Sequence, residues 1–363
     1  MYPYCYREEP NKAEPGLWTA MTNRISPLAV TMGEPAGIGA DIILSTYRLS
    51  AQHALPAFGV IGCAQTLRRR AHLTQHSSIE IVPITCMSDV QPAFERGLPV
   101  LDLPLEHEAR PGKPSSQSAT RVIEWMDLAV KLALAGDVSG MVTAPIHKET
   151  LYQAGFRHEG HTDYLAHLAV RAGYPAQPVM MLSAGDFRTI PLSVHIPLAQ
   201  VPAAVTHDAI VTQAHIIDRD LKRYFDIAQP RIAVAGLNPH AGENGTIGLE
   251  DRDIIAPAVQ ALKQAGLTAF GPVSADTLFH EQARATYDAA LCMYHDQALI
   301  PVKAIGFHEG INTTLGLPFV RTSPDHGTAL TLAGTGTANP SSFIAALKQA
   351  ERMTGNIVPP ATS

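Results

Sequence analysis

Cysteine is scarce in this sequence, with four residues among 363: Cys5, Cys63, Cys86 and Cys292. They form no CxxC pair and no zinc-ribbon spacing, which excludes the common thiolate zinc sites. Isolated thiols are typical of proteins in a reducing compartment, so we expect a cytoplasmic protein with reduced cysteines.

Basic runs and long apolar runs are also lacking. The formal net charge of −6 argues against a nucleic-acid partner. The densest basic cluster, Arg68–Arg70, falls on a predicted helix, and we expect it to be a solvated face. No apolar run reaches the roughly 18 residues of a membrane span, so no membrane partner is expected. Residues 1–24 lack the apolar core of a secretory signal, and we interpret them as a disordered extension.

What is present is ordinary globular composition, with 46% hydrophobic and 17% charged residues, in a chain long enough for two domains. Apolar runs alternate with helical patterns from residue 28 to residue 145, which predicts a mostly parallel sheet covered by helices. Residues 178–198 read as two strands joined by a tight turn at Gly185 and Asp186. The fold class is therefore α/β, with an antiparallel hairpin in the middle of the chain.

Three predicted strands of the second half run into a histidine: His195, His240 and His295. In open α/β sheets ligands bind beyond the carboxyl ends of strands, and three protein ligands with an open position suit a catalytic metal. Among 16 histidines a single strand-end histidine is more often an ordinary surface or core residue. The sequence "NPHAGENG" around His240 favours a metal-ligand role for this histidine, because it is typical of neither a helix nor a strand and indicates a loop that can approach a ligand. Asp276 and Asp296 can orient such ligands, or can act only in caps and turns.

Other polar stretches can be interpreted either as ligand-binding segments or as ordinary structural ones. "GEPAGIGAD", residues 33–41, is either a weak phosphate-cradling turn or a tight strand-to-helix turn. "GHTDYLA" puts His161 and Thr162 at a helix start, where an anion can bind, although Thr162 can be a plain N-cap. Further cationic and amide candidates for a phosphate or carboxylate are Lys303, Asn312 and Arg321.

The motifs together resemble one enzyme family. "TMGEPAGIGAD", "TAPIHKE", "GHTDYLA", "LNPHAGENGTIGLED", "GPVSADTLF", "MYHDQALIPVK" and "NTTLGLPFVRTSPDHGTA" occur in this order over about residues 28–353. They look like the 4-hydroxythreonine-4-phosphate dehydrogenase family of vitamin B6 synthesis. "DHGTALTLAGTGTANP" is also similar to the loop that holds the adenosine of the nicotinamide cofactor in isocitrate and isopropylmalate dehydrogenases.

The resemblance implies two α/β/α domains around a central cleft, of the isocitrate/isopropylmalate dehydrogenase type. Residues 25–155 with 305–363 would form the domain with the cofactor loop. Residues 156–304 would carry the metal ligands and the dimer contacts. The family also implies a homodimer with active sites shared between the subunits.

Residue roles follow from the same resemblance. The metal ligands would be His195 and His240 of one subunit and His295 of its partner, holding Zn²⁺, Co²⁺ or Mg²⁺. Lys303, Asp276 and Asp296 are the candidates for the general base. The phosphorylated substrate would contact His161, Thr162, Lys303, Asn312 and Arg321. The contacts to NAD or NADP would come from His326, Gly327, Thr328, Ala329 and Asn339.

The implied reaction oxidises the C3 hydroxyl of 4-phosphooxy-L-threonine with NAD(P)⁺, after which the 3-keto acid loses CO₂ to give 3-amino-2-oxopropyl phosphate. Two alternatives remain open. A paralogue would act on 4-phospho-D-threonate or 4-phospho-D-erythronate, and a metal-dependent phosphate hydrolase would need the histidines but no cofactor loop.

Overall fold

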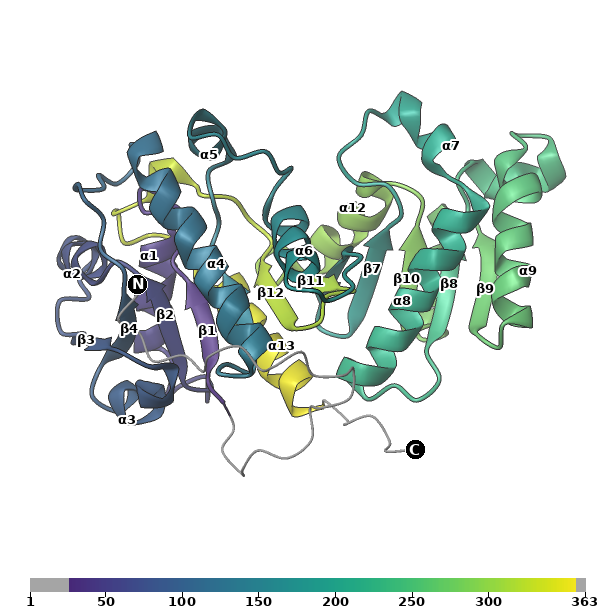
Figure 1. The fold of residues 1–363 in the computed structure, drawn as a ribbon. Coiled ribbons are helices and arrows are strands. Elements are labelled where there is room, and N and C mark those ends of the chain that lie inside the picture. The colour runs from purple at the N-terminus through teal and green to yellow at the C-terminus, as the bar shows by residue number, and fades with distance from the viewer. Residues whose placement is uncertain (1–25, 357–363) are drawn as a thin grey trace. The chain divides into compact units, whose positions relative to one another are not determined.

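The computed structural model describes residues 26–356 as two compact units (Figure 1). Unit 1 contains the described residues 26–176 and 317–356, and unit 2 is Gln177–Gly316. The extension expected at residues 1–24 lies outside the described residues. Within residues 26–356, no helix has both the length and the apolar character needed to cross a membrane.

The unit limits differ from the expected limits at residues 155 and 305. The helix at residues 161–171 belongs to unit 1 because it packs there, and the Tyr164 hydroxyl donates a hydrogen bond to Asp127 at 2.5 Å. The strand Ile311–Leu315 belongs to unit 2 because it pairs with Val179–Ala184. Neither contact has a marker in the local sequence.

Unit 1 is built on six parallel strands in the order β3-β4-β2-β1-β5-β12. Its strands are β1 (Leu28–Thr31), β2 (Phe58–Gly62), β3 (Ile81–Ile84), β4 (Leu98–Asp102), β5 (Gly140–Thr143) and β12 (Val320–Pro324). Its α-helices are α1 (Gly39–Arg48), α2 (Ala64–Leu73), α3 (Val90–Phe94), α4 (Ala119–Ala135), α5 (Lys148–Gln153), α6 (His161–Arg171) and α13 (Ser341–Gly355).

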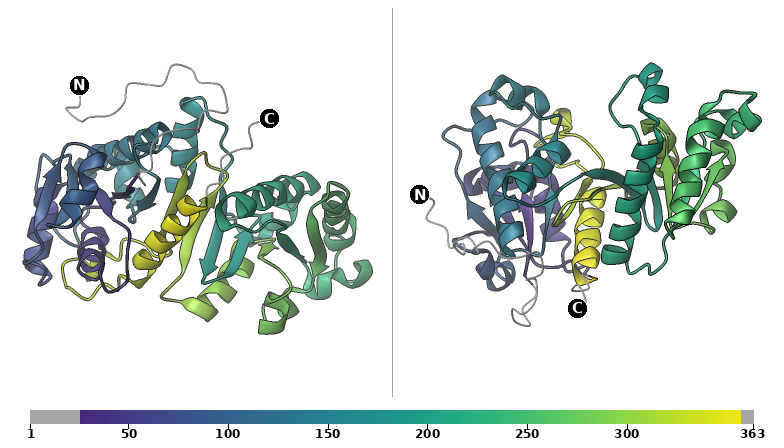
Figure 2. Two further views of the ribbon diagram at one scale, coloured as in Figure 1. Left: turned by 90° about the horizontal axis from the view of Figure 1, so that it is seen from below. Right: turned by 45° about the vertical axis from the view of Figure 1, so that its right-hand side comes forward.

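The helix α4 shows how the sequence specifies this unit. Its apolar residues recur at helical spacing, and Val122, Trp125, Met126 and Ala129 are buried. The helix ends at Gly136, which has a φ of 75° and therefore takes the left-handed C-cap conformation that glycine adopts without strain. Helices lie against the strands in both units (Figure 2).

Unit 2 has the strand order β11-β6-β7-β10-β8-β9, in which β11 with β6 and β6 with β7 are antiparallel and the other pairs are parallel. Its strands are β6 (Val179–Ala184), β7 (Phe187–Pro191), β8 (Arg231–Ala235), β9 (Thr268–Val273), β10 (Ala289–Cys292) and β11 (Ile311–Leu315). Its α-helices are α7 (Val201–Ala204), α8 (His207–Phe225), α9 (Ala256–Gln264), α10 (Ala275–Leu278), α11 (Glu281–Arg284) and α12 (His295–Gly306). The prediction of a mostly parallel α/β fold with an antiparallel hairpin at Gly185 and Asp186 is confirmed.

One expectation about the basic cluster is wrong. Arg70 is buried, with 2% of its side chain exposed, because it forms an ion pair with Asp41 inside unit 1. Its neighbour Arg69 does face solvent, with 45% of its side chain exposed.

Candidate functional site

The three predicted metal ligands all belong to unit 2 and follow neighbouring strands. β7, β10 and β8 are adjacent and parallel, so their carboxyl ends lie at one edge of the sheet. His195 follows β7, His240 lies in the loop after β8, and His295 begins α12 directly after β10. The ring centroids of His195 and His295 are 5.7 Å apart.

The loop that carries His240 has an unusual backbone. Residues 240–244 all have positive φ values, between 41° and 77°, and four of the five are not glycine. Such a conformation is strained for an L-residue and persists only where the surroundings hold it. The buried carboxylate of Asp251 provides part of this support: it accepts hydrogen bonds from the backbone N–H groups of Leu237 and Asn238, at 2.8 and 3.0 Å. It also accepts one from Nδ2 of Asn238 at 2.9 Å.

Gln297 joins two of the strand ends, a role that no sequence pattern indicated. Its side chain, 8% exposed, accepts a hydrogen bond from Met293 N at 2.6 Å. Its Nε2 donates to Gly236 O at 2.8 Å. Gln297 therefore links the chain before His295 to the chain before His240.

Both predicted carboxylates adjoin a histidine. Asp296 Oδ1 lies 2.7 Å from Nδ1 of His295, an arrangement that orients the ring and leaves Nε2 available to a ligand. Asp276 lies in the first turn of α10, where the hydroxyl of Ser274 donates to it at 2.5 Å. This hydrogen bond, with a further contribution from His240, lowers the pKa of Asp276. Within residues 26–356 of a single chain, no three histidine, cysteine or acidic side chains converge closely enough to hold a metal ion.

A cationic cluster forms in unit 1 around Arg321 of β12. Arg321 is 3% exposed, and its Nε and Nη2 donate to the Thr143 hydroxyl at 3.2 and 2.7 Å. Burial lowers the pKa of Arg321 to about 10. Burial also lowers the pKa of His161, and the charges of Arg321 and Lys148 lower it further, so the imidazole is neutral. Its Nε2 is buried with no hydrogen-bond partner among the described residues.

The remaining substrate candidates are divided between the units. Thr162 is the second residue of α6, and Gly160 is the N-cap residue, so the plain N-cap reading of Thr162 is wrong. Lys303 and Asn312 belong to unit 2. Lys303 lies in the last turn of α12, with Nζ 5.6 Å from the ring centroid of Phe307. Asn312 lies on β11, and its Oδ1 is buried without a partner in the part of the chain that the structure describes.

The predicted cofactor residues lie in the loop of residues 325–339 in unit 1. His326 Nδ1 lies 3.0 Å from the carbonyl oxygen of Gly327, and Ala329 has a φ of 39°. Thr328 O accepts a hydrogen bond from Ile38 N at 3.0 Å. Asn339 also serves α13, since its Oδ1 accepts from the backbone N–H of Ser341 at 2.9 Å.

The stretch at residues 33–41 is a tight strand-to-helix turn. Gly33 has a φ of 70°, and a Cβ there would collide with the carbonyl oxygen of Pro145. Glu34 is buried, and its carboxylate accepts from Ala36 N at 3.0 Å. Burial raises the pKa of Glu34. The second of the two readings therefore describes the local structure.

These features define a class of protein: two-unit α/β chains in which histidine-bearing loops gather at the carboxyl edge of parallel strands. The model of the family described as pyridoxal phosphate biosynthetic protein PdxA matches residues 55–350, and the chain belongs to this family. It is 49% identical over 335 residues to the 4-hydroxythreonine-4-phosphate dehydrogenase of Caulobacter vibrioides, covering 92% of this chain and 98% of that protein. It is 47% identical to the enzyme of the same name from Bradyrhizobium diazoefficiens, covering 90% and 96% of the two chains. The crystal structure of 4-hydroxythreonine-4-phosphate dehydrogenase from Klebsiella pneumoniae superposes with a TM-score of 0.81 at 38% identity, covering 91% of this chain and 99% of that one.

Proposed function

We propose that this chain is a 4-hydroxythreonine-4-phosphate dehydrogenase. It would oxidise the C3 hydroxyl of 4-phosphooxy-L-threonine with NAD⁺ or NADP⁺, and the keto acid formed would lose CO₂ to give 3-amino-2-oxopropyl phosphate. The observation that carries the proposal is that His195, His240 and His295 each follow one of three adjacent strands, with Asp296 beside His295. The family and its relatives, which bear this enzyme's name, support the choice of substrate.

A divalent metal, Zn²⁺, Co²⁺ or Mg²⁺, would be held by His195, His240 and His295. The donor set fits, since imidazole side chains suit a divalent ion and Asp296 fixes the orientation of one of them. Such an ion supplies a Lewis acid that polarises the C3 oxygen in both oxidation and decarboxylation. The backbone hydrogen bonds of Asp251 and Gln297 would hold the loops that place these side chains.

Substrate binding is assigned to His161, Thr162, Lys303, Asn312 and Arg321. One observation in each unit supports a contact with a polar ligand: Nε2 of His161 in unit 1 and Oδ1 of Asn312 in unit 2 are buried without partners among the described residues. Buried polar atoms are nearly always hydrogen-bonded, so a ligand is the expected partner. The guanidinium of Arg321 suits the phosphate.

The candidates for the general base are Lys303, Asp276 and Asp296. The pKa of Asp276 is lowered by the Ser274 hydroxyl, which makes this carboxylate a weaker base. Asp296 already uses Oδ1 to hold His295. The loop with His326, Gly327, Thr328, Ala329 and Asn339 would hold the cofactor.

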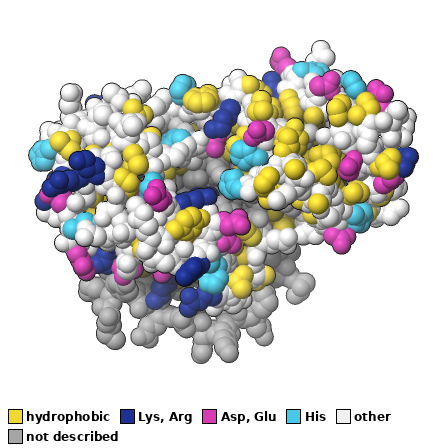
Figure 3. Space-filling model, turned by 90° about the horizontal axis from the view of Figure 1, so that it is seen from above, with side chains coloured by type: hydrophobic (Ala, Val, Ile, Leu, Met, Phe, Trp, Pro, Cys, Tyr) yellow, Lys and Arg dark blue, Asp and Glu magenta, His cyan; other side chains and the backbone are white. Residues whose placement is uncertain are grey.

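The enzyme would work as a homodimer with shared active sites, in the cytoplasm. Unit 2 has several exposed large apolar side chains. In the right-hand part of Figure 3, hydrophobic and histidine side chains lie side by side on the surface. Apolar surface of this kind is typical of a protein interface. In the described part of the chain, the exposed apolar side chains of unit 2 are Ile196, Leu198, Ile247, Leu249, Ile300, Ile305 and Phe307.

A steady-state assay at 340 nm tests the activity. The purified protein is given 4-phosphooxy-L-threonine or 4-phospho-D-erythronate, each with NAD⁺ and with NADP⁺. We expect reduction of a cofactor with the first substrate, loss of turnover on chelation, and recovery with Zn²⁺, Co²⁺ or Mg²⁺. A preference for the erythronate would identify the paralogue, and phosphate release without absorbance change would identify a hydrolase. Full activity of a preparation that elemental analysis shows to be metal-free would contradict the metal site.

A further inference from the structure

A buried ion pair in unit 1 has no part in the proposed chemistry. Arg70 of α2 and Asp41 of α1 contact each other directly, and each side chain is 2% exposed. Two charges withdrawn from water are stable only where further hydrogen bonds satisfy them. The partners of the two side chains therefore indicate what the pair holds in place.

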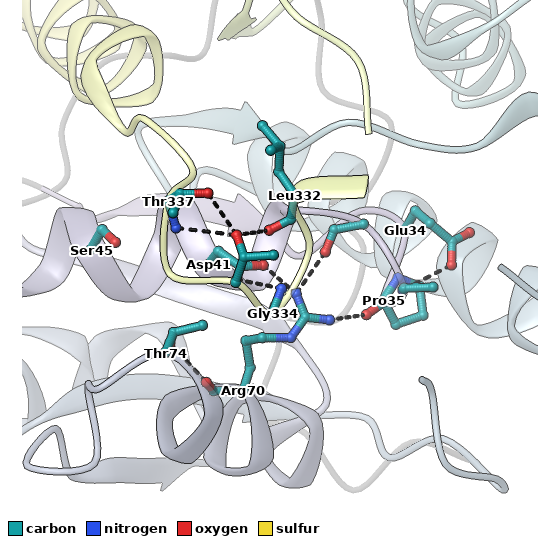
Figure 4. A network of polar contacts seen from close by, with 12 residues as sticks. Glu34, Pro35, Asp41, Ser45, Arg70, Thr74, Leu332, Gly334 and Thr337 are labelled. Atoms are coloured by element: carbon teal, nitrogen blue, oxygen red, sulfur yellow. Dashed lines mark hydrogen bonds and ion pairs between the residues drawn. The ribbon is translucent and has the colours of Figure 1, made fainter. Parts of the chain in front are cut away.

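The pair connects two separate stretches of chain (Figure 4). The guanidinium of Arg70 donates to the carbonyl oxygens of Gly37 at 2.8 Å and of Pro35 at 3.1 Å, both in the turn of residues 33–41. Oδ1 of Asp41 accepts from the backbone N–H of Gly334 at 2.9 Å. Gly334 belongs to the loop of residues 325–339, so the pair ties this loop to the turn.

The same turn meets the loop at a second place. Ile38 N donates to Thr328 O at 3.0 Å, and a Cβ on Gly37 would lie 3.1 Å from Cβ of Thr328. Inside the loop, the Thr335 hydroxyl donates to Leu332 O at 2.7 Å. The loop is thus fixed both by its own hydrogen bonds and by the turn beneath it.

We propose that the Asp41–Arg70 pair positions the loop of residues 325–339 for the adenosine end of the nicotinamide dinucleotide. The inference rests on the proposed function, which assigns the cofactor to this loop. Neither side chain has to touch the cofactor, because the pair acts through Gly334 and the turn. A loop already ordered before binding adds its contacts without the loss of conformational freedom that a mobile loop would suffer.

The main test variant is Asp41→Leu combined with Arg70→Met. It removes both charges together, so no single charge is left buried, and such replacements are commonly tolerated. The matched control is Arg69→Met, which removes the next arginine of α2, whose contact is an exposed ion pair with Glu108 at 3.2 Å. A second variant, Asp41→Asn, keeps the size of the side chain but removes the ion pair with Arg70 and the charge that strengthens the hydrogen bond from Gly334.

Calorimetry on the full chain would measure Kd for NAD⁺ or NADP⁺, ADP-ribose, nicotinamide mononucleotide and the phosphorylated substrate, alongside Tm. We expect the double variant to bind the dinucleotide and ADP-ribose about tenfold or more weakly, the loss expected for one charge-assisted hydrogen bond. The Kd values for the mononucleotide and the substrate should stay within about twofold, a split that general loosening of the fold would not produce. The control should match the wild type.

An unchanged Kd for ADP-ribose in the folded double variant would overturn the inference. If the double variant does not fold, Asp41→Asn decides: a several-fold loss of ADP-ribose affinity supports the inference, and an unchanged Kd overturns it. A wild-type protein that binds neither dinucleotide would instead contradict the proposed function, and the inference with it.

Discussion

The shared active site gives the sharpest prediction, because symmetry sets its magnitude. Consider His195→Ala, His240→Ala and His295→Ala, each made separately. Every site of each variant homodimer lacks one proposed ligand, so all three should be inactive. Two variants are then unfolded and refolded together, and the specific activity of the mixture is compared with that of both parents and of refolded wild type.

For His240→Ala with His295→Ala, the expected recovery is roughly a quarter of wild-type activity. Random pairing makes about half the dimers mixed, and in a mixed dimer one of the two sites collects both changes while the other collects neither. The result requires only that His240 and His295 reach one site from different subunits. Native mass spectrometry would confirm that mixed dimers form.

The mixture of His195→Ala with His295→Ala then assigns His295. The family resemblance places His195 and His295 on different subunits, and recovery of roughly a quarter would agree with it. Their ring centroids are 5.7 Å apart within one chain, an arrangement in which both can serve one site. If His195 and His295 of one subunit do serve the same site, the mixture of His195→Ala with His295→Ala stays inactive. The mixture of His195→Ala with His240→Ala then recovers activity instead. Absence of recovery in all three mixtures, with mixed dimers present, would refute the shared site.

Three further predictions concern single side chains. Arg321→Ala should raise KM for the phosphorylated substrate roughly tenfold to a hundredfold with little change in kcat, because it removes a charge-assisted contact of roughly 1.5–3 kcal/mol; an unchanged KM would show that Arg321 does not bind the phosphate. Gln297→Met should lower the free energy of unfolding by about 1–3 kcal/mol, because it leaves Met293 N and Gly236 O without their partner; urea titration measures this, and chelator competition should show weaker metal binding. Since burial lowers the pKa of His161, the unfolded chain takes up a proton below about pH 6.5 and the folded chain does not. Stability should therefore fall as the pH falls from 7 to 5, and His161→Gln should show a shallower fall in urea midpoints; equal slopes would contradict a neutral buried His161.

The elements predicted well from the sequence are those with strong local patterns. The helix α8 has clear local limits, because Thr206 caps it by accepting from Ala209 N at 3.2 Å and Asp226 ends it with a φ of 56°. The hairpin was predictable from two apolar runs around Gly185 and Asp186.

Other elements had no such pattern. β11 reads "INTTL" and β12 reads "VRTSP", polar sequences that are strands because they pair in the sheets of the two units. α12 starts directly after the turn that follows β10 and contains Pro301, which argues locally against a helix. Tertiary contacts decide these three elements, so a single sequence does not show them.

The same division holds for the candidate site. The histidines at the strand ends were predictable because parallel strands bring their carboxyl ends to one edge. The residues that hold the histidine loops were not predictable. Asp251 and Gln297 act by hydrogen bonds to the backbone of other segments, and the sequence alone does not indicate which segments these are. Arg70 was expected on a solvated face because its neighbours are basic, and only the fold brings Asp41 to it.

The buried carboxylates of Asp251 and Asp41 hold their loops for the same physical reason. A loop can place a side chain where no regular element can, but a loop with mobile backbone would spread that side chain over many positions. In unit 2 Asp251 holds Leu237 and Asn238, which lead into the strained residues around His240, and in unit 1 Asp41 holds the loop of residues 325–339. In both cases a buried carboxylate accepts backbone N–H groups that the irregular chain leaves without partners. Neutralising either carboxylate should therefore affect the geometry of its loop before it affects the sheet, because the strand ladders do not depend on it.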